Sequence, residues 1–142
     1  MKVLLINGSP RANGNTHAAL AEAARTLEAE GIEAQIEWIG NGGIRGCIGC
    51  GKCKEKGDDR CIFDDDRCNA LIEKAADADG YLVGSPVYYA GANGSLISLL
   101  DRMFYAGGSL MRFKPAAGLA CARRAGTTLT IDRAEAKGSG VE

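Results

Sequence analysis

The chain has 142 residues, of which 17 are basic and 18 acidic, giving a net charge of −1. Hydrophobic residues make up 46% and charged residues 25%, a composition typical of a globular domain and not of a disordered segment. A charge so close to zero argues against nucleic acid or an anionic membrane as a partner, and the longest apolar runs are too short to span a bilayer. The N-terminus enters an apolar run at Val3 without the features of a signal peptide, so we expect a cytoplasmic protein.

Four segments have the pattern of β-strands. Residues 2–6 and 80–84 are continuous apolar runs followed by turn residues, as in strands buried on both faces. Residues 32–38 alternate apolar and polar side chains, which predicts an edge strand with one face in water. Residues 116–122 are small and apolar and suit a third buried strand.

Helical spacing of apolar side chains predicts three helices between these strands. They cover residues 15–31, residues 67–76, and a segment from a cap near Asn93 or Ser95 to Phe104. The alternation of strand and helix indicates a parallel sheet with helices on both faces. We therefore predict one doubly wound α/β domain over residues 1–142.

The loop after the first strand has the composition of a phosphate site. In such a sheet, ligands bind beyond the carboxyl ends of the strands, where the strand order reverses. Residues 8–16 offer hydroxyls at Ser9 and Thr16, the amide of Asn15, the cation of Arg11, and free N–H groups at a helix start. The alternative is an ordinary strand–helix turn with a capping threonine.

The loop after residues 80–84 places two neighbouring aromatic side chains, Tyr88 and Tyr89, beside a strand end. A flat heteroaromatic ligand could stack there and bond to backbone N–H groups. The alternative, that both tyrosines belong to the core, is weakened because neighbours on a regular element cannot both point inward.

Four cysteines fall within fifteen residues of a long glycine-rich loop, residues 40–66. Their spacing is Cys47-x2-Cys50-x2-Cys53-x7-Cys61. The gaps of two residues let thiolates converge, so a 4Fe–4S cluster, a four-cysteine zinc site and a reduced, empty loop all remain open. Cys68 and Cys121 lie outside the spacing, and we expect them to be buried thiols. The C-x5-R spacing of Cys61 and Arg67 is not a phosphatase signature here, because three intervening aspartates would repel a phosphate.

Two of these motifs together resemble a known family. Asn7-Gly8-Ser9-Pro10-Arg11 with Gly14-Asn15-Thr16, followed by Gly84-Ser85-Pro86-Val87-Tyr88, is similar to the NAD(P)H-dependent FMN reductases, which are flavodoxin-like proteins. The compact cysteines and the acidic run Asp64–Asp66 resemble the iron–sulfur flavoprotein branch of that family. The resemblance covers about residues 1–133.

The resemblance implies FMN as cofactor and NAD(P)H as electron donor. It assigns the FMN phosphate to the β-strand–helix loop, the isoalloxazine ring to the loop after residue 85, and the polar edge of the ring to a pair of arginines. The residues expected to bind the cofactor are Ser9, Arg11, Asn13, Gly14, Asn15, Thr16, Pro86, Val87, Tyr88, Tyr89, Gly91, Arg123 and Arg124. The expected ligands of a cluster are Cys47, Cys50, Cys53 and Cys61. No protein acid, base or nucleophile is assigned, because the flavin carries the chemistry.

The leading functional hypothesis is an FMN-dependent oxidoreductase that passes electrons to a small-molecule or redox-protein acceptor, through the cluster if one is bound. The alternatives are a non-enzymatic carrier like flavodoxin and a metal-stabilised module without flavin. Residues 134–142 are polar and too short to supply the last strand and helix of the family fold. Residues 116–122 would then form an uncovered sheet edge, which favours a homo-oligomer.

Overall fold

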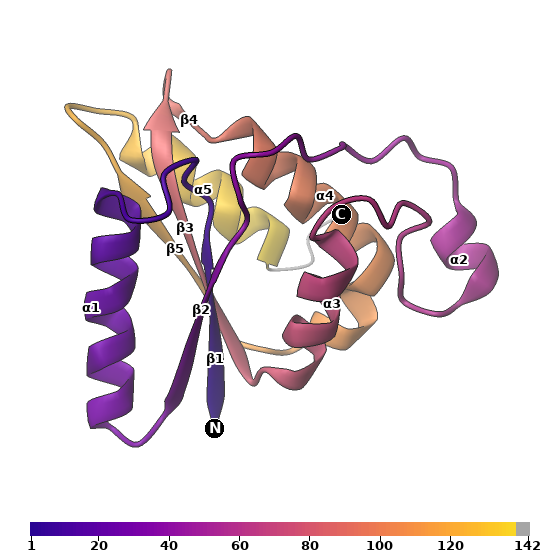
Figure 1. The fold of residues 1–142 in the computed structure, drawn as a ribbon, viewed down its shortest axis with the longest axis horizontal. Helices are drawn as coiled ribbons and strands as arrows, with labels where there is room; N and C mark the ends of the chain where they lie inside the picture. The colour runs from indigo at the N-terminus through magenta and orange to yellow at the C-terminus, as the bar shows by residue number, and fades with distance from the viewer. Residues whose placement is uncertain (139–142) are drawn as a thin grey trace.

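The structure, a computed structural model, describes the backbone of residues 1–138 and the side chains of residues 1–132. Strands and helices alternate over most of its length (Figure 1). The elements in chain order are β1 (Lys2–Asn7), α1 (Asn15–Ala29), β2 (Glu33–Trp38), α2 (Lys52–Lys56), α3 (Cys68–Asp77), β3 (Gly80–Tyr88), β4 (Gly91–Ala92), α4 (Gly94–Met111), β5 (Ala116–Cys121) and α5 (Thr127–Gly138).

The strands form one mainly parallel sheet in the order β2-β1-β3-β5, with the short β4 antiparallel to the end of β3. β1 pairs with β2 on one side, from Lys2 opposite Glu33, and with β3 on the other, from Val3 opposite Gly80. The chain therefore reverses its direction of travel across the sheet after β2. This reversal places the loops after β1 and β3 side by side, where α/β proteins of this kind bind ligands.

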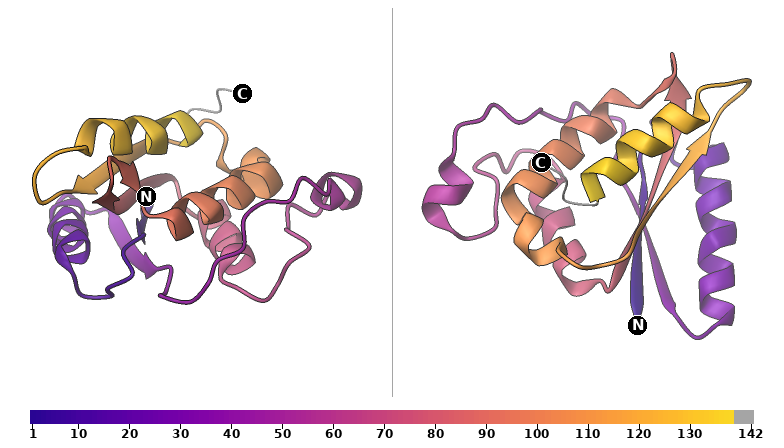
Figure 2. Two further views of the ribbon diagram at one scale, coloured as in Figure 1. Left: turned by 90° about the horizontal axis from the view of Figure 1, so that it is seen from above. Right: turned by 180° about the vertical axis from the view of Figure 1, so that it is seen from behind.

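Helices cover both faces of the sheet, but unequally. Leu4 and Ile6 of β1 face a large core formed with α3 and α4, whereas Leu5 between them faces a smaller core with Leu20 of α1. Figure 2 shows α3, α4 and α5 on the face opposite α1. Leu82 of β3 packs only partly buried on the α1 side. The predicted doubly wound α/β fold is confirmed.

Several sequence predictions need correction. β3 does not stop at Ser85 and Pro86 but continues to Tyr88, because β4 folds back and pairs with its last residues. The residues of β5 are exposed or half-buried instead of buried, since within the described chain this strand pairs with β3 alone. The helix α5 was not predicted, and it includes residues 134–138 of the polar tail; residues 139–142 lie outside the described chain.

The predicted wet face of β2 is also wrong at one position. Glu37 is 8% exposed, because Arg67 and Lys74 from the α3 side pair with its two carboxylate oxygens. Burial raises the pKa of Glu37, but the ion pairs outweigh it and hold that pKa below its usual value. The short helix α2 inside the cysteine-rich loop was not predicted either. No helix in the described part of the chain is long and apolar enough to cross a membrane.

Candidate functional site

The loop between β1 and α1 is built around Asn7, the last residue of β1, which is fully buried. Its side-chain carbonyl accepts a hydrogen bond from the N–H of Ser9 at 3.1 Å, and its amide donates to the carbonyl of Ala12 at 3.1 Å. The Ser9 hydroxyl in turn accepts from the N–H of Arg11 at 3.1 Å. These bonds fold the loop back on itself.

Three other segments fix the same loop from outside. The N–H of Gly8 donates to Gly84 of β3 at 2.8 Å, and the side chain of Asn93, at the start of α4, donates to the carbonyl of Gly8 at 2.7 Å. The indole N–H of Trp38, at the end of β2, donates to the carbonyl of Ser9 at 2.7 Å. A Cβ on Gly8 would lie 2.6 Å from a methyl of Leu96, so only glycine allows this close packing.

The loop leads into α1, whose N-terminus has no capping side chain. Gly14 is the N-cap of α1 and makes no side-chain capping bond, and the first turn carries no acidic residue. The predicted capping role of Thr16 is therefore not what the structure shows. Thr16 instead lies 2% exposed inside the first turn, against Gly84, where a Cβ would meet its methyl at 3.0 Å. Unneutralised N–H groups at a helix start attract an anion.

The predicted phosphate residues divide into two groups. Ser9 and Thr16 are buried in the loop and helix start, at 5% and 2% exposure. The other polar members reach solvent at the rim of the same loop. They are Arg11, Asn13 and Asn15.

The predicted ring site is a tight hairpin. Tyr89 and Ala90 join β3 to β4 with φ angles of 50° and 61°, a left-handed conformation that non-glycine residues adopt at a cost. Tyr88 is 49% exposed and Tyr89 fully exposed, so neither belongs to the core. Such strain is concentrated at functional sites in proteins.

The loop after β5 packs against this hairpin. Gly126 has a φ of 95°, and a Cβ there would lie 2.8 Å from Ala90 Cα and 2.9 Å from a methyl of Val87. Arg123 and Arg124 are exposed on the same loop. Pro86 and Gly91, the remaining predicted ring residues, lie half-buried on the two strands of the hairpin. The structure thus gathers the predicted residues at the carboxyl ends of β1, β3 and β5.

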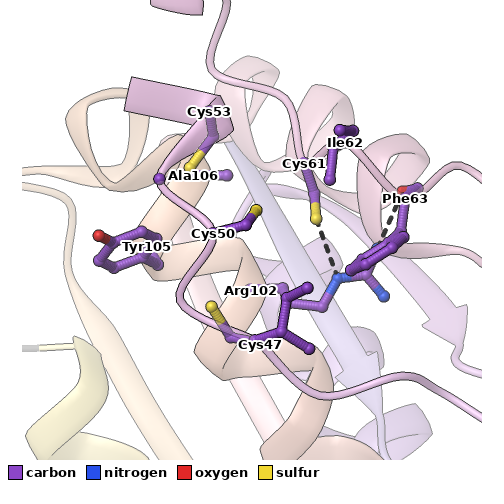
Figure 3. A pocket seen from close by; sticks show the side chains of 11 residues that line it. Cys47, Cys50, Cys53, Cys61, Ile62, Phe63, Arg102, Tyr105 and Ala106 are labelled. Atoms are coloured by element: carbon purple, nitrogen blue, oxygen red, sulfur yellow. Dashed lines mark hydrogen bonds between the residues drawn. The ribbon is translucent and has the colours of Figure 1, made fainter. Parts of the chain in front are cut away.

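The four cysteines of the x2-x2-x7 spacing line one pocket (Figure 3). Cys53 is buried and Cys61 half-buried, whereas Cys47 and Cys50 are exposed. The other pocket walls come from residues 45–66, here called the cysteine segment, and from α4. They are Ile48, Gly51, Ile62, Phe63, Arg102, Tyr105 and Ala106.

The two remaining thiols differ from each other. Cys68 is fully buried, as predicted, and burial raises its pKa to about 12. It is therefore a neutral core side chain. Cys121, at the end of β5, is half-exposed and not buried as predicted, because β5 lies at the edge of the sheet.

The arrangement of the thiols bears on what they could hold. Among the described residues, no three Cys, His, Asp or Glu side chains stand close enough together to bind one metal ion. A zinc ion draws four sulfurs to about 2.3 Å from a single point. An iron–sulfur cluster spreads its thiolates around a larger body. The four thiols around the pocket are the described residues that could hold such a group.

Sequence reasoning named Asn7 within a motif and Asn93 as a possible helix cap, and Asn93 is indeed the N-cap of α4. It did not predict that Asn7, Trp38 and Asn93 position the β1–α1 loop, or that Asn69 and Arg102 position the cysteine segment. For Arg102 the sequence carried a usable signal. This residue falls three residues after Leu99 and one before Met103, so a charge interrupts the apolar face of a helix.

The fold and the loops at its switch point define a flavodoxin-like protein. The chain matches the family described as NADPH-dependent FMN reductase over residues 1–135, and it belongs to that family. An iron–sulfur flavoprotein of Methanocaldococcus jannaschii is 41% identical over 102 residues, which are 72% of this chain and 51% of that protein. The chain spans about half the length of the curated relatives it matches. Both levels of the predicted resemblance are confirmed.

Solved structures agree with the fold. An NADH:FMN oxidoreductase in its apo form has a TM-score of 0.58 at 26% identity, with 92% of this chain and 63% of that chain aligned. An NAD(P)H:quinone oxidoreductase from Methanothermobacter marburgensis has a TM-score of 0.66 at 14% identity, covering 88% of this chain and 68% of that one.

Proposed function

We propose that this chain is an FMN-dependent oxidoreductase. It would pass electrons from NAD(P)H through bound flavin, and through an iron–sulfur cluster in the cysteine segment, to a small-molecule or redox-protein acceptor. FMN, when bound, accepts a hydride from reduced nicotinamide and releases its electrons singly or in pairs. The proposed location is the cytoplasm, whose reducing conditions keep thiols free.

The observation that carries the proposal is the loop and open helix N-terminus at the start of α1. Hydrogen bonds within the chain fix the loop, and Gly14 leaves the helix N-terminus without a capping side chain. Because the Ser9 oxygen already accepts a bond from Arg11 N–H, its own O–H is the group left to donate to a phosphate oxygen. The Arg11 side chain, at the rim, can add a charge-assisted bond.

The hairpin and the loop after β5 would form the ring site. Tyr88 and Tyr89 expose aromatic faces on which an isoalloxazine can stack, and the hairpin N–H groups can bond to its edge. Arg123 and Arg124 would stand at the polar end of the ring. The family membership of the chain supports this assignment.

Helix α4 connects this region with the cysteine pocket. Leu96, in its first turn, packs against Gly8 of the β1–α1 loop, while Arg102 and Ala106 line the pocket. Arg102 lies six positions after Leu96, which is about 9 Å along the helix axis. We propose that the cysteines Cys47, Cys50, Cys53 and Cys61 hold a 4Fe–4S cluster that exchanges electrons with the flavin.

Trp38 provides the first test, because its indole N–H bonds to the β1–α1 loop. We expect FMN to change Trp38 fluorescence on binding, and the double variant Arg11→Ala, Thr16→Ala to bind FMN about 10- to 100-fold more weakly while riboflavin binding changes little. The matched control is Arg25→Ala, Thr26→Ala, an exposed pair further along α1. Equal losses for both ligands would contradict a phosphate site in this loop.

Steady-state assays separate the enzyme from a carrier. Flavin-loaded protein that oxidises NADH or NADPH continuously with an added acceptor supports the proposal. If only a partner reductase can reduce the flavin-loaded protein, the protein is instead a carrier like flavodoxin. If the protein is colourless after anaerobic addition of FMN and removal of the unbound FMN, flavin binding is overturned altogether.

We also propose that the protein is a homo-oligomer. Ala116 and Ala117 of the β5 edge are exposed, and Leu129 on the adjoining helix α5 is 61% exposed. An uncovered edge of small apolar residues can pair with a second copy. Sedimentation should show a dimer or larger species whose melting temperature falls on dilution; a monomer with a melting temperature independent of concentration would rule this out.

A further inference from the structure

Arg102 is a charged side chain in the interior of the protein. It lies on α4 with 1% exposure and is among the largest fully buried side chains of the described residues. Its Nε donates to Cys61 Sγ at 3.2 Å and its Nη2 to the carbonyl of Phe63 at 2.9 Å. Its Nη1 donates to the carbonyl of Arg45 at 3.2 Å and to the carboxylate of Asp66. Each of these acceptors belongs to the cysteine segment (Figure 3 shows the bond to sulfur).

The pairing with Asp66 would by itself neutralise the buried charge. Burying a guanidinium costs several kcal/mol unless a counter-charge and hydrogen bonds compensate. The bond to Cys61 is an additional one, and it goes to sulfur, which is a weak acceptor as a neutral thiol. A sulfur that carries negative charge, as a metal-bound thiolate does, is the acceptor that suits this donor.

Cys61 is held by its main chain as well. Its N–H donates to the side-chain carbonyl of Asn69 at 2.8 Å, and the Asn69 amide donates back to the Cys61 carbonyl at 2.9 Å. Asn69 is 2% exposed. With both its backbone and its sulfur fixed, Cys61 differs from Cys47 and Cys50, which are exposed to solvent.

The acidic run after Cys61 explains how Arg102 is oriented. Each of its three carboxylates pairs with a different arginine: Asp64 with Arg60, Asp65 with Arg45, and Asp66 with Arg102. Only the last pair is buried on both sides, with side-chain exposures of 8% and 0%. Asp66 therefore turns the guanidinium so that its Nε faces Cys61.

We propose that Arg102 is the positioning residue of the iron–sulfur site: it fixes the Cys61 sulfur and raises the reduction potential of the cluster through one N–H···S bond. The inference rests on the proposed function, since it requires a cluster at the four cysteines. Hydrogen bonds to sulfur and nearby charge are the means by which proteins set such potentials.

The test compares three variants with the wild type after anaerobic cluster reconstitution: Arg102→Lys, Arg102→Gln and, as matched control, Arg45→Gln. Arg45 lies in the same segment and pairs with Asp65, but it is half-exposed and only its backbone carbonyl contacts Arg102. Iron and acid-labile sulfide are counted per chain, the midpoint potential is measured by redox titration, and circular dichroism monitors folding.

We expect about four iron atoms per chain in the wild type and in Arg45→Gln, with equal potentials. Arg102→Lys keeps the charge but lacks the guanidinium Nε that donates to the Cys61 sulfur. This variant should therefore bind the cluster, and the reduction potential of the cluster should be more negative. Arg102→Gln should lose iron to a chelator about 10- to 100-fold more readily. An unchanged potential in Arg102→Lys would overturn the role of Arg102 while leaving the cluster in place. A wild type that binds no iron would overturn the proposed cluster and this inference together.

Discussion

The β1–α1 loop and the cysteine segment both present polar groups to a ligand, but they are ordered by different means. Regular elements surround the loop and hold it through the backbone of Gly84 in β3 and the side chains of Trp38 at the end of β2 and Asn93 at the start of α4. The cysteine segment contains one short helix, α2, and is attached to the core through side chains, above all Arg102 and Asn69. The residues of the proposed phosphate site are therefore held on several sides, whereas half of the thiols remain exposed around a pocket.

We therefore expect the two regions to tolerate substitutions differently. The loop depends on the absence of side chains, since Gly8 and Gly84 admit Leu96 and Thr16 at contact distance. The segment depends on the presence of one buried ion pair.

Removal of the Asp66 carboxylate should disturb the cysteine segment most. Asp66→Ala leaves the buried Arg102 without its counter-charge, and we expect the free energy of unfolding to fall by about 3–5 kcal/mol. Asp65→Ala is the control, because that carboxylate is exposed and pairs with a half-exposed arginine, so its loss should matter far less. Chemical denaturation of both variants measures the difference; similar losses would mean that the segment does not depend on the buried pair.

A side chain at Gly8 should disturb the β1–α1 loop. A Cβ there would meet Leu96 at 2.6 Å and the carbonyl of Gly84 at 2.8 Å, so Gly8→Ala should destabilise the fold by about 1–3 kcal/mol and weaken FMN binding. A Cβ on Gly43 would have no neighbouring atom within 4 Å, so Gly43→Ala is a control expected to be neutral. Stability and FMN titrations that do not distinguish the two variants would refute the close packing.

Alkaline pH should test the junction between the cysteine segment and the core. Burial raises the pKa of Cys68 to about 12, above the value near 8.5 of an exposed thiol. The contribution of the neutral buried thiol to the free energy of unfolding is complete below the unfolded-state pKa. It is lost as the pH rises toward the folded-state pKa. The wild type should therefore lose about 2 kcal/mol more than Cys68→Ala between pH 8 and pH 10. Parallel pH profiles of the two proteins would show that Cys68 does not remain a neutral buried thiol.

Relief of the hairpin strain should have the smallest effect on stability. Replacing Tyr89 by Asn and Ala90 by Gly supplies residues that adopt positive φ readily, so the protein should gain up to about 1 kcal/mol. The same variant should bind FMN more weakly, because it loses an exposed aromatic face. Tyr105→Asn, an exposed tyrosine at the cysteine pocket, is the control for flavin affinity. Unchanged FMN affinity in the hairpin variant would remove the hairpin from the ring site.

The alternation of strands and helices, the parallel sheet and the loops at its carboxyl ends could be predicted from the amino-acid sequence. These features rest on local patterns: the apolar runs of β1 and β3, the helical spacing of α1, and the polar loop over residues 8–16. The cysteine spacing could also be interpreted from the sequence, because gaps of two residues allow the thiolates to converge regardless of the surrounding structure.

Which side chains meet across long separations could not be predicted, because it depends on the tertiary structure. Arg102 reaches Cys61 from 41 positions away, and Trp38 reaches Ser9 from 29. The alternating pattern of β2 predicts that Glu37 faces solvent. In the structure, Arg67 and Lys74 from the α3 side pair with its carboxylate, and the residue is buried. A local pattern reports the face that a residue presents, whereas burial and hydrogen-bond partners depend on which element packs against that face. For this reason the loops after β1 and β3 and the cysteine-rich loop could be predicted from the sequence, but the residues that hold them in place could not.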